Sequence, residues 1–208
     1  MLEHVPHWLG ALLRTVRAGH GKLLAAQPAL EARAIIDLTS PAFAHGARLP
    51  ARFTADDIGV SPPLLWGELP AATTSLALIV EDPDAPLPSP LVHALVWNID
   101  PAKGRLAEGE IVKDGAGADD GSDVGRNSYL VEGLLPPDPP TGHGVHDYVF
   151  QIFALSQAPP IGANPGRAAL LRALEGHVLA TGILTGTYSR GEEAPLSGGM
   201  TASPIAAA

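Results

Sequence analysis

Two proline-bounded stretches of the chain concentrate side chains that could do chemistry. The first reads Glu81-Asp82-Pro83-Asp84-Ala85-Pro86 and follows an apolar run. Proline fixes φ and has no N–H to donate, so this stretch is predicted to be a stiff loop rather than more strand. Taken alone, Asp-Pro-Asp is more often a surface turn than a site. Its two closely spaced carboxylates on a rigid backbone therefore indicate a functional site only in combination with a second cluster.

The second stretch runs from Pro136 to Tyr148 and reads PPDPPTGHGVHDY. Loops of this kind present side chains and backbone N–H groups to a ligand at the rim of a sheet. For His146, at the start of an apolar strand, a hydrogen-bonding role in the structure and a role in function are both open. His143 stands between two glycines and is predicted to be an exposed loop residue.

A third candidate is His93, in the apolar run Leu-Val-His-Ala-Leu-Val-Trp. A polar residue inside a buried strand must find a hydrogen-bond partner. The carboxylates of Asp82 and Asp84 would supply one.

These residues must be positioned by a strand-rich scaffold. Short apolar runs bounded by Pro, Gly or Asp predict strands at 35–39, 51–54, 75–81, 91–99, 148–156 and 183–189. One later helix is predicted, with Asn164 as N-cap, Pro165 in the first turn and a buried face that extends to Val178 and Leu179. Many strands, few helices and long Pro-rich loops favour a mostly-β antiparallel sandwich with a helix packed beside it.

Three regions are predicted along the chain: an N-terminal amphipathic helix (1–33), one domain (34–190) and a flexible tail (191–208). In the first region an apolar stripe recurs at helical spacing, at Leu2, Val5, Leu9, Leu12 and Val16. We expect this stripe to dock on its own domain or on a partner subunit, and the second case would give a homodimer.

Composition excludes several classes of function. The 208 residues include no cysteine, so thiol nucleophiles and thiolate zinc sites are excluded. A formal net charge of −9 disfavours nucleic acid and anionic lipid as partners. No apolar run reaches the roughly 18 residues that cross a bilayer, and the N-terminus lacks the pattern of a secretory signal. We therefore expect a cytoplasmic protein with no integral membrane association.

In their order along the chain, these segments resemble the phosphatidylethanolamine-binding protein family, which includes the Raf kinase inhibitor proteins and many bacterial members. The resemblance rests on Ser61-Pro-Pro-Leu-Leu-Trp66, Glu81-Asp-Pro-Asp-Ala-Pro86, His93-Ala-Leu-Val-Trp-Asn98 and Pro139-Pro-Thr-Gly-His-Gly-Val-His-Asp-Tyr148. It implies a large central sheet with a smaller sheet, flanking helices, and a turn stabilised by Asn127. It also implies a pocket for phosphate- or carboxylate-type anions. Carried over by position, the pocket residues are Asp82, Asp84, His93, Pro139, Pro140, His146 and Tyr148.

The chain departs from the bacterial pattern at Pro136, which removes a backbone donor, and at Asp138, which adds a negative charge. The resemblance also favours a cis peptide bond before Pro83 or Pro86.

The function predicted from these features is non-catalytic binding of a small anion, with a regulatory or inhibitory role towards other proteins. No catalytic residue, metal or cofactor is assigned. Carboxylates close to His93 and His146 would hold the imidazoles protonated, so that they could donate to an anion. The alternative is a metal-dependent hydrolase that uses His93, His146, Asp82 and Asp84, although the chain has no His-Glu-X-X-His motif.

Overall fold

A computed structural model describes residues 6–113, 122–162 and 165–190, and the fold of these residues is built on two β-sheets. The larger sheet has six strands in the order β1-β9-β8-β4-β5-β7, and the smaller has three in the order β2-β3-β6. The strands are β1 (Ala34–Ile35), β2 (Leu38–Thr39), β3 (Leu64–Trp66), β4 (Ser75–Asp82), β5 (Leu91–Ile99), β6 (Arg105–Leu106), β7 (Asp123–Val124), β8 (His146–Leu155) and β9 (Val178–Tyr188). The helices are α1 (His7–Leu13) and α2 (Arg167–Leu174), with 3-10 turns η2 (His20–Lys22), η3 (Leu24–Ala26), η4 (Pro28–Leu30), η5 (Ala51–Phe53) and η6 (Pro101–Lys103).

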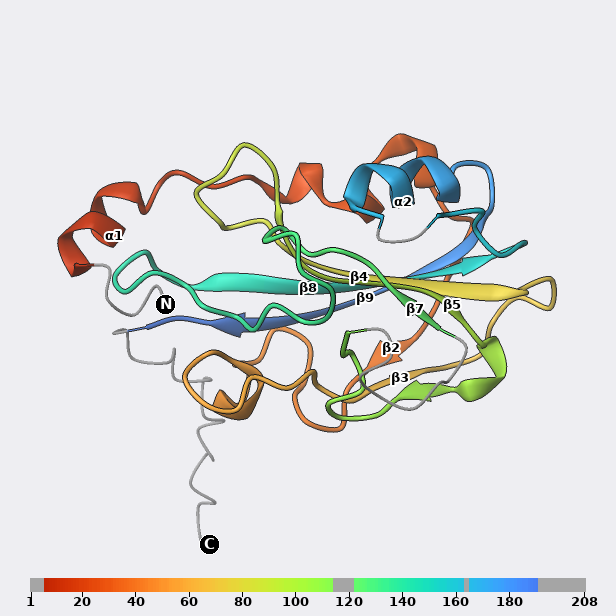
Figure 1. Cartoon of the computed structure of the whole chain (residues 1–208), viewed down its shortest axis with the longest axis horizontal. Helices are drawn as coiled ribbons and strands as arrows, with labels where there is room; N and C mark the ends of the chain where they lie inside the picture. Colours follow the sequence, from red (N-terminus) through yellow and green to blue (C-terminus); the bar gives the residue numbers. More distant parts are fainter. Residues whose placement is uncertain (1–5, 114–121, 163–164, 191–208) are drawn as a thin grey trace, which may run out of the picture.

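The centre of the large sheet is β4, which lies antiparallel to both β5 and β8 and is buried along its whole length. In Figure 1 the N-terminal segment and α2 lie on one side of this sheet, and β2 and β3 lie on the other. Both faces of β4 are therefore covered, which explains why its sequence has no polar alternation. The predicted mostly-β fold with two sheets and flanking helices is confirmed.

Two apolar cores follow from the alternation of side chains along the central strands. Leu76, Leu78 and Val80 of β4 face the core that includes Leu38, Leu64 and Trp66 of the small sheet. The residues between them face the core on the helical side, which contains Ala77, Ile79, Leu24, Leu30, Leu170 and Leu174. Because the side-chain period of a strand is two, Glu81 and Asp82 at the end of β4 must also point to opposite faces.

Several predicted elements differ from the observed ones. The predicted strand 35–39 is two short strands in different sheets, β1 and β2, and β1 pairs with β9 in parallel, so the large sheet is not wholly antiparallel. The predicted strand 51–54 is instead the turn η5, which spans Ala51–Phe53. Helix α2 ends at Leu174 because Gly176 turns the chain with φ of +77°, and Val178 and Leu179 belong to β9. The predicted N-cap Asn164 lies outside the described residues, and the N-cap position of α2 is Gly166.

The N-terminal region also differs from the single helix predicted over 1–33. Helix α1 spans only His7–Leu13, and the chain then continues through three separate 3-10 turns to Leu30. Residues 1–5 and 191–208, with the start of the predicted stripe and the tail, lie outside the described residues. Within the stripe, Leu9 is partly buried, but Leu12 is 69% exposed. The contact face of α1 is instead centred on buried Gly10, where an added Cβ would lie 2.2 Å from the Thr141 carbonyl oxygen.

Every peptide bond in the described ranges is trans, so the predicted cis bond before Pro83 or Pro86 is wrong. No helix in the same ranges combines the length and the apolar character that a membrane span requires.

The first prediction concerns the N-terminal turns, whose apolar side chains belong to the core although they precede the strands. Leu24 is fully buried in the helical-side core, whereas Leu12 on α1 is exposed. Leu24→Ala should therefore lower the free energy of unfolding by about 2–4 kcal/mol, because it leaves a cavity. Leu12→Ala should change it by less than about 0.5 kcal/mol. Urea denaturation of both variants measures the difference, and equal effects would mean that the turns do not pack as described.

Candidate functional site

A cavity of about 330 Å³ opens where the ends of β4, β5 and β8 meet. Its floor carries polar side chains from these strands: Asp82, His93, His146 and Tyr148. Its walls are largely apolar and come from the loops and from the N-terminal segment: Leu9, Leu13, Ala85, Pro86, Leu87, Leu91, Leu135, Pro136, Pro139 and Pro140. The cavity thus combines a small polar area with a larger apolar surface, as ligand pockets commonly do.

The polar floor is organised around the buried pair of Asp82 and His146. Oδ2 of Asp82 lies 2.8 Å from Nδ1 of His146, and both side chains are almost fully buried. Oδ1 of Asp82 accepts hydrogen bonds from the backbone N–H groups of Asp84 (2.7 Å) and Ala85 (3.0 Å). The stiff Asp-Pro-Asp loop therefore folds back on its own first carboxylate, which fixes that carboxylate against the imidazole.

A second imidazole extends this pair into a chain of hydrogen bonds. Nε2 of His146 lies 2.6 Å from Nδ1 of His143, and Nε2 of His143 lies 2.8 Å from the carbonyl oxygen of Leu13 in α1. The prediction of an exposed His143 is wrong, since its exposed fraction is 0%. The reason is α1, which packs over the Gly-His-Gly loop and supplies the acceptor that a buried imidazole needs.

The hydrogen bonds from Asp82 through His146 and His143 to Leu13 determine how many protons the two imidazoles carry. The Leu13 carbonyl can only accept, so Nε2 of His143 carries a proton, and a carboxylate at Asp82 requires a proton on Nδ1 of His146. If both imidazoles were neutral, the two remaining nitrogens would be acceptors facing each other at 2.6 Å. One further proton is needed, and it belongs on His146 beside the carboxylate. Burial, followed by the neighbouring His146, lowers the pKa of His143, which agrees with a neutral His143.

His93 and Tyr148 provide the polar atoms of the floor that remain unused. Nδ1 of His93 lies 2.7 Å from the Leu135 carbonyl oxygen, so it carries the proton of the neutral ring and leaves Nε2 as an acceptor. Neither Nε2 of His93 nor the Tyr148 hydroxyl finds a hydrogen-bond partner within the described part of the chain. The two rings meet edge to face with centroids 5.1 Å apart. Buried polar atoms without partners are rare, and here both belong to residues that line the cavity.

The predicted bond between His93 and the aspartates is absent, and with it the predicted imidazolium at His93. Burial lowers the pKa of His93 and outweighs the opposing attraction of Asp82. Burial likewise raises the pKa of Tyr148. Both side chains are thus neutral near pH 7.

The added acid at position 138 is neutralised within the protein. Arg190 forms an ion pair with Asp138 and also donates to the Pro139 carbonyl oxygen and to Asp56. Burial opposes the charge on Arg190, but the hydrogen bonds that it donates to Asp56 and Asp138 prevail and raise its pKa. The negative charge that Asp138 brings to the wall is therefore paired with a buried guanidinium, and no local sequence pattern predicts this pairing.

Of the seven predicted pocket residues, six line the cavity and one does not. Asp84 points away, where it pairs with Arg17 and accepts the backbone N–H of Asp147. The prediction of a turn-stabilising Asn127 is confirmed, because its Oδ1 accepts from the N–H groups of Tyr129 and Val131. The leucines of the wall were all missed by sequence reasoning: Leu9, Leu13, Leu87, Leu91 and Leu135. Only the apolar stripe around Leu9 gave a signal, and nothing indicated what it would cover.

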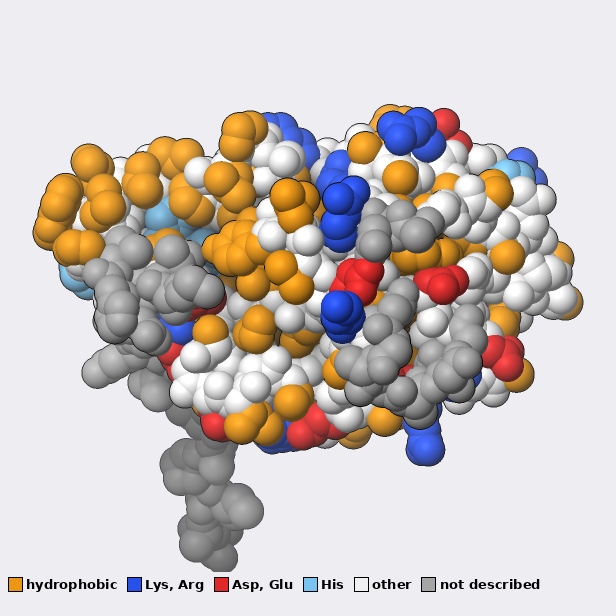
Figure 2. All heavy atoms as spheres, in the orientation of Figure 1, with side chains coloured by type: hydrophobic (Ala, Val, Ile, Leu, Met, Phe, Trp, Pro, Cys, Tyr) orange, Lys and Arg blue, Asp and Glu red, His pale blue; other side chains and the backbone are white. Residues whose placement is uncertain are grey.

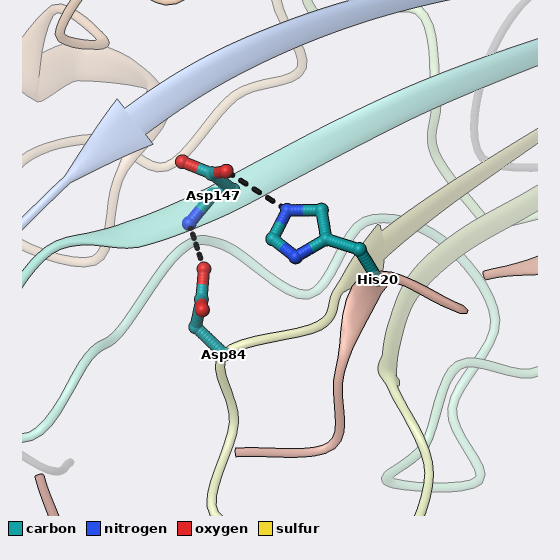
Figure 3. Close-up of side chains that lie close together, drawn as sticks. All are labelled: His20, Asp84 and Asp147. Atoms are coloured by element: carbon teal, nitrogen blue, oxygen red, sulfur yellow. Dashed lines mark hydrogen bonds and ion pairs between the residues drawn. The ribbon is translucent and has the colours of Figure 1, made fainter. Parts of the chain in front are cut away.

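Among the described residues, one group of His and acidic side chains is close enough to hold a metal ion, and it is not the predicted one. It consists of His20, Asp84 and Asp147 (Figure 3). His20 hydrogen-bonds Asp147 at 3.0 Å, while both oxygens of Asp84 are engaged by Arg17 and by the Asp147 N–H. This group ties the N-terminal segment to β8. At the floor, the ring nitrogens of His143 and His146 are all committed to the hydrogen-bond chain.

Comparison with known proteins agrees with this geometry. The family model for phosphatidylethanolamine-binding proteins matches residues 39–189. Two curated relatives are the UPF0098 proteins of Chlamydia muridarum, 36% identical over 159 residues, and of Methanothermobacter thermautotrophicus, 38% identical over 156 residues. The matches cover 74% and 75% of this chain, and 99% and 100% of the relatives.

Solved structures give the same result. The Chlamydia trachomatis homologue CT736 is 34% identical, with a TM-score of 0.67 over 75% of this chain and 98% of its own. Escherichia coli YbcL, described as a member of the mammalian family, is 30% identical, with a TM-score of 0.70 over 75% of this chain and 99% of its own. The chain belongs to the phosphatidylethanolamine-binding protein family.

The second prediction tests the buried pair at the floor. Asp82→Asn removes the counter-charge of the His146 imidazolium, and breaking a buried pair in this way should lower the free energy of unfolding by about 3–5 kcal/mol. Asp147→Asn is the matched control, because it weakens the exposed pair with His20 and should cost at most about 1 kcal/mol. Denaturation at pH 7 compares the two. Similar small losses would show that Asp82 and His146 do not form a charged pair.

Proposed function

We propose that this protein binds a small phosphate- or carboxylate-type anion at the floor of the cavity, through His93 and Tyr148. The observation that carries the proposal is the pair of buried, unpartnered polar atoms on residues that line it. An acidic ligand can satisfy both. One of its oxygens accepts from the Tyr148 hydroxyl, and its acidic proton is shared with Nε2 of His93.

The charges around the floor favour binding of an anion together with a proton. The carboxylate of Asp82 at the floor is paired with His146, and that of Asp138 in the wall is paired with Arg190, which also contacts Asp56. The floor is therefore close to neutral before a ligand binds. His93 becomes an imidazolium when the anion stands beside it, because an opposite charge at close range stabilises the protonated ring. The complex then gains one ion pair without any unpaired charge.

No observation favours the alternative function, a metal-dependent hydrolase. Its four residues do not act as a ligand set: Asp82 and His146 are bonded to each other, and Asp84 faces another part of the surface. We propose binding without catalysis. A regulatory or inhibitory role towards another protein would then follow from ligand occupancy.

The third prediction concerns the hydroxyl of Tyr148. Tyr148→Phe removes one hydrogen bond to a charged ligand and should weaken the binding of phosphorylethanolamine or a short carboxylate by about 1.5–3 kcal/mol, measured by calorimetry. Tyr129→Phe is the matched control, because Tyr129 also lines the cavity but is half exposed. It should bind as the wild type does. Unchanged affinity in Tyr148→Phe would refute the assigned role of this hydroxyl.

The fourth prediction is a pH dependence. Since burial lowers the pKa of free His93 and the anion raises it, binding takes up a proton between these two pKa values. Carboxylate affinity should therefore rise as the pH falls from 8.5 to 5.5, by up to tenfold per pH unit, and His93→Gln should flatten the curve. Affinity that rises with pH, or that requires added zinc, would instead support the metal-dependent reading.

A further inference from the structure

The N-terminal segment, residues 6–33, lies before the region that the family model matches, which begins at residue 39. Relatives that are matched over 98–100% of their own length account for only about three quarters of this chain. The segment is thus not part of what these relatives share with the chain. Nevertheless it forms part of the cavity wall, through Leu9, Gly10 and Leu13.

The segment is attached across the site by polar contacts with both signature stretches. On the side of the first stretch, Ala18 N donates to the Ala85 carbonyl oxygen (3.0 Å), and Gly19 N donates to that of Pro83 (2.8 Å). On the side of the second, Leu13 accepts from His143, as described above. Arg17 joins the two sides, since it pairs with Asp84 and donates to the Val145 carbonyl oxygen at 3.0 Å. The position of α1 over the cavity is therefore determined from several directions.

Helix α1 presents two different apolar surfaces. Leu9 and Leu13 are partly buried and line the cavity, whereas Trp8 and Leu12 are 66% and 69% exposed. Figure 2 shows hydrophobic side chains gathered over the end of the molecule that carries α1. The inward pair and the outward pair lie on the same short helix, so each can be changed without the other.

The volume of the cavity exceeds the needs of a bare anion. An apolar cavity of about 150 Å³ holds benzene, and a water molecule occupies about 30 Å³. The cavity here is about 330 Å³, and apart from its polar floor it is enclosed mostly by aliphatic and proline side chains. A phosphate or short carboxylate at His93 and Tyr148 would leave most of the apolar wall without contact.

We propose that the N-terminal segment makes this site selective for amphipathic acids, in which the acidic group carries an alkyl or aryl body of about six to ten carbons. The inference rests on the proposed anion site and deepens it. The acidic group binds at His93 and Tyr148, and the apolar body lies against Leu9 and Leu13 of α1 on one side and Leu87 and Leu91 on the other.

The test is a series of straight-chain carboxylates from propionate to decanoate, titrated below their micellar concentrations at constant pH. In the wild type each CH₂ beyond the third carbon should increase affinity by roughly two- to fourfold until the cavity is full. Leu9→Ser combined with Leu13→Ser should flatten this dependence on length, so that decanoate loses far more affinity than propionate does. The control, Trp8→Ser combined with Leu12→Ser, should retain the wild-type dependence.

A second variant keeps the test decisive if the double serine variant does not fold. Leu9→Trp fills part of the cavity and should shift the best ligand to a shorter chain. If propionate binds but affinity does not rise with length in the wild type, the amphipathic ligand is refuted while the anion site stands. A dependence on length that survives in folded Leu9/Leu13 and Leu9→Trp variants would refute the role of the N-terminal segment. If no acid binds at any length, the proposed function itself fails.

Discussion

Two adjacent buried carboxylates at the end of β4 organise the rest of the structure. Because side chains alternate along a strand, Glu81 points to the helical side and Asp82 to the cavity. Glu81 accepts from the backbone N–H of Leu24 (2.7 Å) and from Gln151 (2.8 Å), and it pairs with Arg167 of α2. Asp82 holds its own loop and His146. Burying a carboxylate without such partners would lower the free energy of unfolding by several kcal/mol. Each carboxylate therefore determines where its partner segments must lie.

The floor of the cavity follows from the second of these carboxylates. Asp82 fixes His146, and His146 fixes His143, whose far nitrogen reaches the backbone of α1. This series of hydrogen bonds requires one additional proton. With that proton, Asp82 and His146 form a neutral pair of one carboxylate and one imidazolium. It serves as a rigid, charge-balanced support. The proposed ligand contacts belong to Nε2 of His93 and the Tyr148 hydroxyl, which have no hydrogen-bond partner elsewhere in the described ranges.

The N-terminal segment links the two sides of this arrangement. The backbone N–H of Leu24 donates to Glu81, and the carbonyl oxygen of Leu13 accepts from His143. The same segment therefore closes the helical-side core and covers the cavity. Some of its contacts come from backbone groups and from Gly10, where close approach leaves no room for a side chain. In the proposed function, a segment outside the common family region therefore changes which ligands fit, while the floor proposed to bind the anion stays the same.

The sequence alone determined the central strands, the family and the polar residues at the floor of the candidate cavity. Short apolar runs predict β4, β5 and β8, and the proline-bounded stretches at the end of β4 and at the start of β8 carry Asp82, His146 and Tyr148. Only the tertiary structure decided how these groups are paired and charged. His143 is buried because α1 covers it, His93 is neutral because burial outweighs the nearby aspartate, and Asp138 is matched by Arg190, 52 residues later in the chain. Local patterns encode strands and turns, but burial and charge pairing depend on which distant segments meet, and no spacing in the sequence records that.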